Sequence, residues 1–330
     1  MQNNIQNDIQ YDDEIDLREL FGVLWAGSRK IIAITAVFAF VSVIYALSLS
    51  DQYKATVLLA PAQSDSSDLS GALGQLGGFA SLAGVDIGGG ESSESQMAQE
   101  IMKSWSFIDV FIAENNISVE VYAAEGWSRG SNELQIDDDI YDAETKTWLV
   151  ENDNTGEVGQ PSSWVLFEAF SERLVVSENK KSGLVSASIE YYSPQIAKQW
   201  LDMYVAAINA HMQQRQMAKV SNNINYLQAQ IEIVSNNINY LQAQIENTSI
   251  AEMREAKMRE VFYTIIAEQT KNKMLAKASP EYVFVAVSPS MVPEEKSQPE
   301  RAFICIIGTL LGGILSVLLV LVMHYARKSD

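Results

Sequence analysis

Two long apolar stretches, one near each end of the chain, restrict the fold more than any other feature. Residues 31–49 and 302–323 contain no Asp, Glu, Lys or Arg. Each stretch is long enough to cross ~30 Å of hydrocarbon as a helix that rises ~1.5 Å per residue. We therefore predict transmembrane helices over 31–50 and 301–324, with a large domain between them.

The charges beside these stretches predict their orientation. Cations lie beside one end of each stretch and acids beside the other: Arg29, Lys30, Arg327 and Lys328 against Asp51 and Glu300, with Arg301 as the exception. Cations near a span favour the cytoplasmic side, so both termini are expected there. A cleaved signal peptide ending near Ala46-Leu47-Ser48 is the alternative. The acidic leader and the length of the apolar core argue against it.

The region between the spans is strongly acidic. Residues 51–300 hold 17 Lys and Arg against 35 Asp and Glu, and the whole chain carries a formal net charge of −19. Nucleic acid and anionic lipid both require cationic neutralisation, so neither is an expected ligand of this domain. The single cysteine, Cys305, lies in the second apolar stretch, which excludes a disulfide framework between the spans.

A tandem repeat predicts a coiled-coil helix. The thirteen residues VSNNINYLQAQIE at 220–232 recur unchanged at 234–246, and the two copies start fourteen residues apart. Fourteen residues are two heptads and add about 21 Å of helix. Apolar residues follow one another at alternating spacings of four and three, which is the pattern of a helix–helix seam. The seam comprises Val220, Ile224, Leu227, Ile231, Val234, Ile238, Leu241 and Ile245. We assign this seam to contacts between subunits.

The long helix is expected to begin at Pro194, after the cap residue Ser193, and to run to about residue 246. Ser249 and Glu252 have the spacing of a capping box, which starts a new helix. A hairpin tip at 247–249, marked by Asn247, Ser249 and Glu252, followed by a helix returning over 251–278, accounts for both signals. One straight helix is the alternative.

The remaining segments complete the predicted organisation. Residues 1–30 form a cytoplasmic segment, with an amphipathic surface helix over 15–25. Residues 51–192 form an α/β base, with strands over 52–60, 174–176 and 184–191 and helices over 95–115 and 164–173. The hairpin occupies 193–279. Residues 280–300 hold a strand over 282–287, expected to be buried on both faces, and a proline-rich segment. Residues 325–330 form a cytoplasmic tail. The glycine-rich residues 71–90 are expected to form a surface loop, or a loop packed between subunits.

Little in the sequence points to catalysis. The chain has two histidines, His211 on the predicted long helix and His324 at a membrane edge. A turn at 153–156 resembles a calcium loop, but Ser162 stands where the twelfth position requires an acid. No nucleotide-binding or hydrolase motif occurs. No catalytic, cofactor-binding or metal-binding residue is therefore predicted.

Gly308 and Gly312 lie four residues apart in the second apolar stretch. Small residues at this spacing allow another helix to approach closely. The first span of the same chain and a neighbouring subunit are both possible partners.

Several segments together resemble the Wzz-type chain-length determinants, the class 1 polysaccharide co-polymerases of bacterial inner membranes. The opening resembles the family at IDLRELFGVLW (15–25), QYKATVLLAPAQ (52–63), LGQLGGFASLAG (73–84) and MAQEIMKSWSFIDVFI (97–112). KKSGLVSASIEYYSPQIAKQWLD (180–202) and YLQAQIENTSIAEMREA (240–256) resemble its hairpin region. The most specific match is VPEEKSQPERAFICIIGTLLGG (292–313), in which Pro293, Pro299, Gly308 and Gly312 fall at the family's proline and glycine motif. The tandem repeat departs from the family pattern.

The resemblance implies a membrane-anchored α+β protein, in which two transmembrane helices flank a periplasmic α/β base that carries a long helical hairpin. It implies a ring-like homo-oligomer in the bacterial inner membrane. Together with a Wzy-type polymerase, its role would be to set the length of O-antigen or a related polysaccharide. The polysaccharide, as a lipid-linked glycan, would be a partner of the chain. No cofactor is implied, and the chain itself would form no glycosidic bond.

Two other functions share this architecture. One is a membrane adaptor for polysaccharide or capsule export that works with a separate cytoplasmic tyrosine kinase. The short tail at 325–330 is expected to hold no kinase domain. The other is a structural periplasmic spacer. A change in the length distribution of lipopolysaccharide when the gene is deleted separates a chain-length regulator from a spacer.

Overall fold

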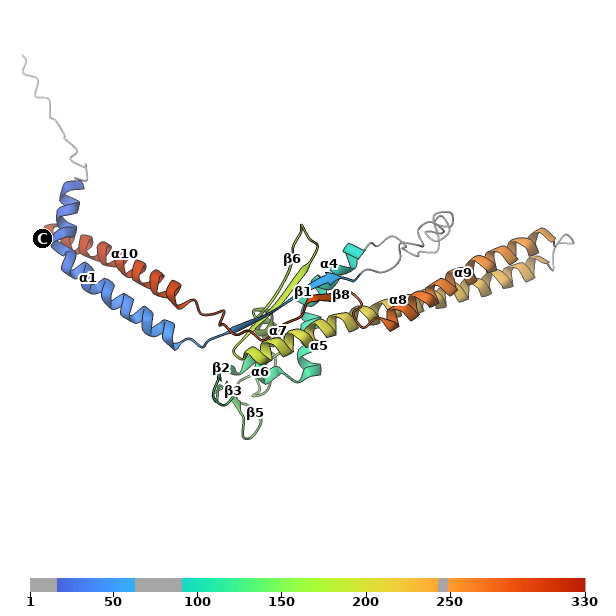
Figure 1. The fold of residues 1–330 in the computed structure, drawn as a ribbon, viewed down its shortest axis with the longest axis horizontal. Coiled ribbons are helices and arrows are strands. Elements are labelled where there is room, and N and C mark those ends of the chain that lie inside the picture. Colours follow the sequence, from blue (N-terminus) through green and yellow to red (C-terminus); the bar gives the residue numbers. More distant parts are fainter. Residues whose placement is uncertain (1–16, 63–90, 243–248, 330) are drawn as a thin grey trace, which may run out of the picture. The chain divides into compact units, whose positions relative to one another are not determined.

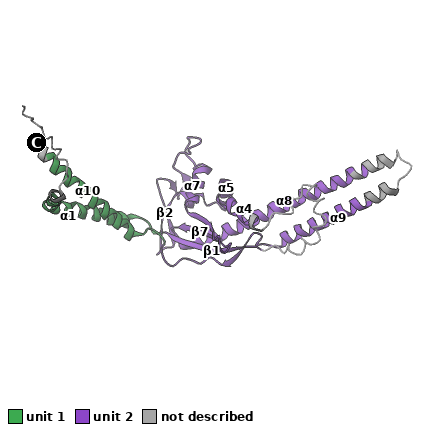
Figure 2. Ribbon diagram, turned by 90° about the horizontal axis from the view of Figure 1, so that it is seen from above, with its two compact units in different colours: residues 1–51, 297–330 green, residues 52–296 purple. Residues whose placement is uncertain are grey.

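The computed structural model describes residues 17–62, 91–242 and 249–329 (Figure 1). The chain divides into two compact units, which Figure 2 colours separately. One unit joins the two ends of the chain, residues 1–51 and 297–330, and the other comprises residues 52–296.

The first unit is a pair of long helices. Helix α1 spans Leu17–Ser48 and helix α10 spans Arg301–Ser329. Within them, Phe21–Ser48 and Arg301–Ala326 are long and apolar enough to cross a membrane. The sequence predicted a separate surface helix over 15–25, but α1 is unbroken from Leu17. No proline interrupts this segment, so nothing in its backbone chemistry stops the helix between the two parts.

The second unit is built on a four-stranded antiparallel sheet of order β6-β7-β1-β8. The strands are β6 (Leu174–Glu178), β7 (Val185–Tyr191), β1 (Tyr53–Pro61) and β8 (Phe284–Ser288). Buried and more exposed residues alternate along β1, as expected for a sheet with one face on a core. Gly183 adopts a φ of +69° in the turn between β6 and β7, a conformation that glycine accepts without strain.

Helices cover the inner face of this sheet. α4 (Glu91–Lys103), α7 (Ser163–Ser171) and the first turns of α8 (Pro194–Gln242) contact the sheet, and α5 (Trp105–Asn115) packs on α4 and α7. The Tyr204 ring lies at the centre of the core, 4.8 Å from the ring of Phe111 and 5.3 Å from that of Phe107. Its hydroxyl donates to the carbonyl of Met102, and burial raises the pKa of the Tyr204 phenol.

The region predicted as one helix over 95–115 is two helices. Ser104 breaks it, with an extended backbone, and its hydroxyl accepts from the Phe107 amide to cap α5. Asn116, in the left-handed conformation, ends α5 where the Asn-Asn pair predicted an end. The break lets α4 and α5 follow different directions over the core.

Short elements lie between α5 and α7. They are α6 (Ser118–Tyr122), the pair β2 (Ala124–Ser128) and β3 (Glu133–Ile136), and the pair β4 (Tyr141–Asp142) and β5 (Thr147–Trp148).

Strand β8 departs from the prediction of a strand buried on both faces. Phe284 is buried, whereas Val285 and Val287 are 37% and 56% exposed. β8 is the last strand of the sheet and pairs with β1 alone among the described strands, so its outer side lacks a neighbour there. Apolar composition alone cannot distinguish such an edge strand from a central one.

A helical hairpin extends from the base. α8 continues to Gln242, and α9 (Ser249–Ala278) packs antiparallel along it (Figure 1). The predicted hairpin is therefore present, and the single straight helix is excluded. The tip residue Asn247 and the side chains of Ser249 and Glu252 lie outside the described part of the chain.

Candidate functional site: the helical hairpin and the paired spans

The described half of the predicted seam lies inside the hairpin. Val220 and Leu227 are 2% and 0% exposed, and Ile224 and Ile231 are half-buried. Helix α9 of the same chain covers this stripe. The side chains of the other four seam residues are outside the description: Val234, Ile238, Leu241 and Ile245. A single copy of the chain therefore already buries the described part of the stripe. The assignment of the stripe to contacts between subunits remains a prediction.

The stripe on α9 that meets this seam was not identified from the sequence. Its members are buried or half-buried and follow spacings of three and four: Arg259, Phe262, Ile266, Gln269, Lys273 and Ala276. Half of them are polar or charged, which hides the heptad pattern from a search for apolar residues. The alternating spacing of three and four along the whole stripe, polar members included, was the available signal.

Two side-chain hydrogen bonds tie the helices together at equivalent positions of the repeat. Lys273 Nζ donates to Ser221 Oγ at 2.6 Å, and Arg259 Nη2 donates to Ser235 Oγ at 2.5 Å. The serines occupy the same place in the two repeat copies, and the cations are likewise fourteen residues apart. One register, in which α8 ascends as α9 descends, therefore holds across both repeat copies.

The base fixes this register. The buried Asn209 side chain accepts from the amides of Val283 and Phe284, both at 2.9 Å, and donates to the Phe284 carbonyl at 3.0 Å. One turn further along α8, Gln213 Nε2 donates to the carbonyls of Ala276 and Ser279 at 2.8 and 3.0 Å. These bonds join α8 to the end of α9 and to the start of β8, so α9 cannot slide along α8 without breaking them.

The spans make close contact through small residues. A Cβ atom on Gly308 would lie 2.5 Å from the Ser42 Cβ, and one on Gly312 would lie 2.4 Å from the Phe38 Cβ. Both distances are shorter than carbon atoms tolerate, so glycine is required for this approach. Of the two partners that the sequence left open, the structure shows the first span of the same chain.

The same contact continues along both helices. Ser316, fully buried, lies 3.3 Å from the Thr35 hydroxyl. Further along, Gly27 packs against Val320 at a distance that leaves no room for a Cβ atom. Small residues at four-residue spacing let two helices meet at van der Waals distance, where packing holds them together.

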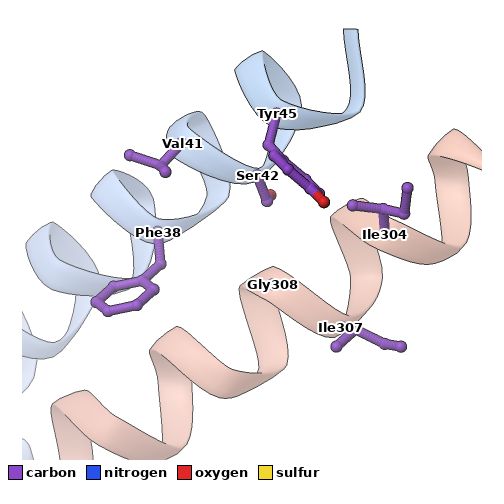
Figure 3. Close-up of a pocket in the computed structure, with 7 residues that line it drawn as sticks. All are labelled: Phe38, Val41, Ser42, Tyr45, Ile304, Ile307 and Gly308. Atoms are coloured by element: carbon purple, nitrogen blue, oxygen red, sulfur yellow. The ribbon is translucent and has the colours of Figure 1, made fainter. Parts of the chain in front are cut away.

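A shallow apolar groove of about 340 Å³ lies beside the Gly308 contact (Figure 3). It is lined by Phe38, Val41, Ser42, Tyr45, Ile304, Ile307 and Gly308. Absence of a side chain at Gly308 opens this surface. The polar side-chain groups in this lining are the hydroxyls of Ser42 and Tyr45, and the Ser42 hydroxyl donates to the Ala39 carbonyl of its own helix at 2.8 Å.

Arg301, the exception to the charge pattern at the spans, has partners at the end of α1. Its guanidinium donates to Asp51 Oδ1 at 2.9 Å and to the Ala46 carbonyl at 3.1 Å. An ion pair with both side chains partly exposed contributes only a few tenths to about 1 kcal/mol. Pro299 is half-buried two residues before α10, and its carbonyl accepts from the Arg301 amide at 2.9 Å. Pro293 is half-buried in the segment after β8.

His211 and Asp153, the two residues considered above for catalysis and for calcium binding, each have a structural partner. His211 is exposed on α8, and its ring packs edge-on against Phe107 at 5.5 Å. Asp153, in the turn that resembles a calcium loop, accepts from the Ser162 hydroxyl at 2.9 Å and from its amide at 3.3 Å. The Ser162 hydroxyl bond lowers the Asp153 pKa. Asp153 thus fastens this turn to the start of α7, and the described residues include no group of three potential metal ligands.

Comparison with known proteins gives a family match for the first part of the chain. Residues 13–115 match the family model described as Wzz, chain length determinant protein. The search of curated proteins gave no match. The matched region runs through α1, β1, α4 and α5, and so includes one of the paired spans and part of the core of the base.

Solved structures of polysaccharide co-polymerases are also similar. A full-length bacterial polysaccharide co-polymerase has 14% identity and a TM-score of 0.39, with 96% of this chain and 99% of that chain covered. A fragment of WzzB from Salmonella Typhimurium has 14% identity and a TM-score of 0.36, with 76% and 100% covered. A mutant of the Shigella flexneri lipopolysaccharide O-antigen chain-length regulator has 10% identity and a TM-score of 0.23, with 75% and 100% covered.

The α+β fold with apolar helices at both ends and a long helical hairpin agrees with the fold that the resemblance implied. The resemblance of this chain to the Wzz chain-length determinants, predicted from its sequence motifs, is thus confirmed by the family match over residues 13–115.

Proposed function

We propose that this chain regulates the length of O-antigen or a related polysaccharide, as an oligomeric inner-membrane scaffold that works with a Wzy-type polymerase. The family match over residues 13–115 carries this proposal, because its description is that of a chain length determinant. The polymerase forms the glycosidic bonds. This chain determines how many are formed before polymerisation stops.

The architecture supports a scaffold. Two helices are long and apolar enough to cross a membrane, and the charges beside them favour cytoplasmic termini. In that orientation the base and the hairpin are periplasmic, on the side where a lipid-linked glycan would be extended. The hairpin, with α8 forty-nine residues long, gives the scaffold a fixed dimension of tens of ångströms.

Deletion of the gene tests the proposal directly. Lipopolysaccharide from the deletion strain, run on a gel, should lose its modal band, and a plasmid carrying the gene should restore the band. An unchanged distribution of lengths would overturn chain-length control and would favour a structural spacer.

The partnership with the polymerase needs a separate measurement. A tagged polymerase purified from membranes after mild cross-linking should carry this chain with it, whereas an unrelated tagged membrane protein of similar abundance should not. Failure to recover the chain in cells that retain a sharp modal band would contradict direct partnership, and chain-length regulation would stand without it.

A further inference from the structure

The sheet of the base has two different open edges. Strand β6 pairs with β7 alone and strand β8 pairs with β1 alone, among the strands that the structure describes. Apolar side chains are exposed on both edge strands, Val175 at 49% on β6 and Val287 at 56% on β8. An exposed edge strand with apolar side chains is a template for pairing with a strand of another chain.

The strand directions favour a second copy as that other chain. Every neighbouring pair in the order β6-β7-β1-β8 is antiparallel, so β6 and β8 run in opposite directions. When copies are related by rotation about an axis along the strands, β6 of one copy keeps its direction in the next. β8 of the first copy would then meet β6 of the second antiparallel, and the alternation would continue through the contact.

When β8 of one copy and β6 of the next are centred on each other, each face of the first sheet continues into the same face of the second. This register places Ala286 opposite Val176. Ala286 pairs with Leu59 and Val176 with Ala187, and both partners are fully buried on the core side of the sheet. Directly opposed residues share a face. Core-side residues of one copy therefore extend the core side of the next.

Charge complementarity supports the same register. Lys181 lies in the turn that follows β6, and Glu281 lies just before β8. Centring the strands brings the turn that holds Lys181 and the segment that holds Glu281 to the same end of the ladder. Both side chains are exposed, and neither has an ion-pair partner within the described ranges. In a chain with a net charge of −19, a contact that pairs a cation with an acid lowers the repulsion between copies.

We propose that β8 of one copy pairs antiparallel with β6 of the next, and that this head-to-tail contact joins the bases into a closed ring. The inference rests on the proposed function, because it supplies the interface of the proposed oligomer. Two different edges meet at each contact, so the assembly does not end at a dimer, and it forms a ring when the rotation between copies closes.

Cysteine cross-linking in native membranes tests this contact. The native Cys305, the only cysteine in the chain, is first replaced by serine. Val285→Cys and Ser177→Cys are then combined, since these positions are directly opposed in the centred register. A short bismaleimide should convert this variant into a ladder of dimers, trimers and higher species. Each single-cysteine variant alone should remain monomeric on a denaturing gel.

Two controls make the result specific. Val158→Cys, at a position 64% exposed and outside the four-stranded sheet, replaces Ser177→Cys in a control pair that should give no ladder. Glu281→Lys should reduce cross-linking of the Val285–Ser177 pair, and the added Lys181→Glu should restore it.

Val287→Cys with Val175→Cys provides a second opposed pair. The absence of a ladder from both pairs would overturn the proposal, and so would a dimer formed by Val285→Cys alone, which indicates a two-fold contact. These readouts do not depend on polysaccharide. If the ladder forms but deletion of the gene leaves the distribution of polysaccharide lengths unchanged, the contact stands and the proposed function is contradicted instead.

Discussion

Lys273 donates a hydrogen bond to Ser221 at 2.6 Å, and Arg259 donates in the same way to Ser235, the equivalent serine of the next repeat copy. Because Asn209 and Gln213 hold the register at the base, a change in the length of α8 must be absorbed at the far end of the hairpin. When residues are inserted into one helix of a hairpin whose base is fixed, the tip moves along the chain and each helix becomes longer by half of the insertion. The fourteen residues of the second copy therefore raise the tip by about 10 Å, half of the 21 Å that they add as helix.

Leu227→Asp should destabilise the hairpin. Leu227 is fully buried between α8 and α9, and an unpaired carboxylate there costs several kcal/mol. The expected result is proteolysis within the hairpin of detergent-solubilised protein under conditions where the parent is resistant. Gln228→Asp, at the exposed neighbouring position, is the control and should behave like the parent. A Leu227→Asp protein that keeps a resistant hairpin but loses its oligomer would show instead that the seam faces another subunit.

The hairpin shows how far the sequence could predict the site. Strict apolar periodicity in the repeat predicted a helix and an apolar stripe along it, which we assigned to contacts between subunits, whereas α9 of the same chain packs along α8. The stripe on α9 was missed because Arg259, Gln269 and Lys273 occupy positions that apolar residues usually hold. Lys273 and Arg259 reach Ser221 and Ser235 with their polar ends, and long side chains of this kind also pack their aliphatic stems on apolar surface.

The base shows the same limit in a different form. The four strands of the main sheet were predicted from composition, since residues that favour strands carry that preference locally. Their order in the sheet is a long-range property. The exposure of Val285 and Val287 follows from the position of β8 at the edge, which composition does not encode. The break at Ser104 was missed because Ser is tolerated inside a helix and also caps one.

Asn209→Ala should weaken the joint between the hairpin and the sheet. The substitution removes partners from the backbone groups of Val283 and Phe284, at roughly 1–3 kcal/mol for each buried group left unsatisfied. Faster hydrogen exchange of the segment around β8 is the expected result. Asn222→Ala, at an exposed position of the same helix, should leave this exchange unchanged. Equal protection in both variants would contradict the role of Asn209.

Gly312→Leu should separate the spans. The leucine side chain would occupy space that Phe38 fills, and such overpacking typically costs about 1–3 kcal/mol. A cross-link between cysteines placed on α1 and α10 should form less efficiently in this variant. Leu311→Ala changes an exposed position of α10 and should cross-link like the parent. Equal efficiency in the two variants would show that the glycine is not needed for the contact.

Acidification should release the turn at Asp153 from α7. The bond from Ser162 lowers the Asp153 pKa below its ordinary value of about 3.9. The bond therefore contributes its full stability above that ordinary value, and the contribution is lost as the pH falls through the lowered pKa. Protection of the first α7 amides from hydrogen exchange should fall over that range.

Asp153→Asn should lack most of this pH dependence, because its side chain does not ionise. Asp138→Asn changes an exposed carboxylate in another turn and should retain it. If Asp153→Asn kept the parent's pH dependence, another group would be responsible for the release.

The register of the hairpin allows it to be shortened without moving its contacts. Residues 234–240 of α8 face residues 254–260 of α9 when the Ser221–Lys273 and Ser235–Arg259 pairs are extended along both helices. Removing both segments takes one heptad from each side and keeps the heptad phase. The hairpin becomes about 10 Å shorter, and the Ser221–Lys273 pair and the contacts of Asn209 remain. Removal of 234–237 alone breaks the phase and serves as the control for a disturbed hairpin.

The modal length of the polysaccharide made by cells that carry this paired deletion is the most direct test of the hairpin as the measuring element. Lipopolysaccharide gels should show a mode that is displaced from the parent's and still sharp, whereas removal of 234–237 should broaden or abolish it. A paired-deletion protein that reaches the membrane, keeps the parent's oligomer size and gives the parent's modal length would contradict a measuring role for the hairpin.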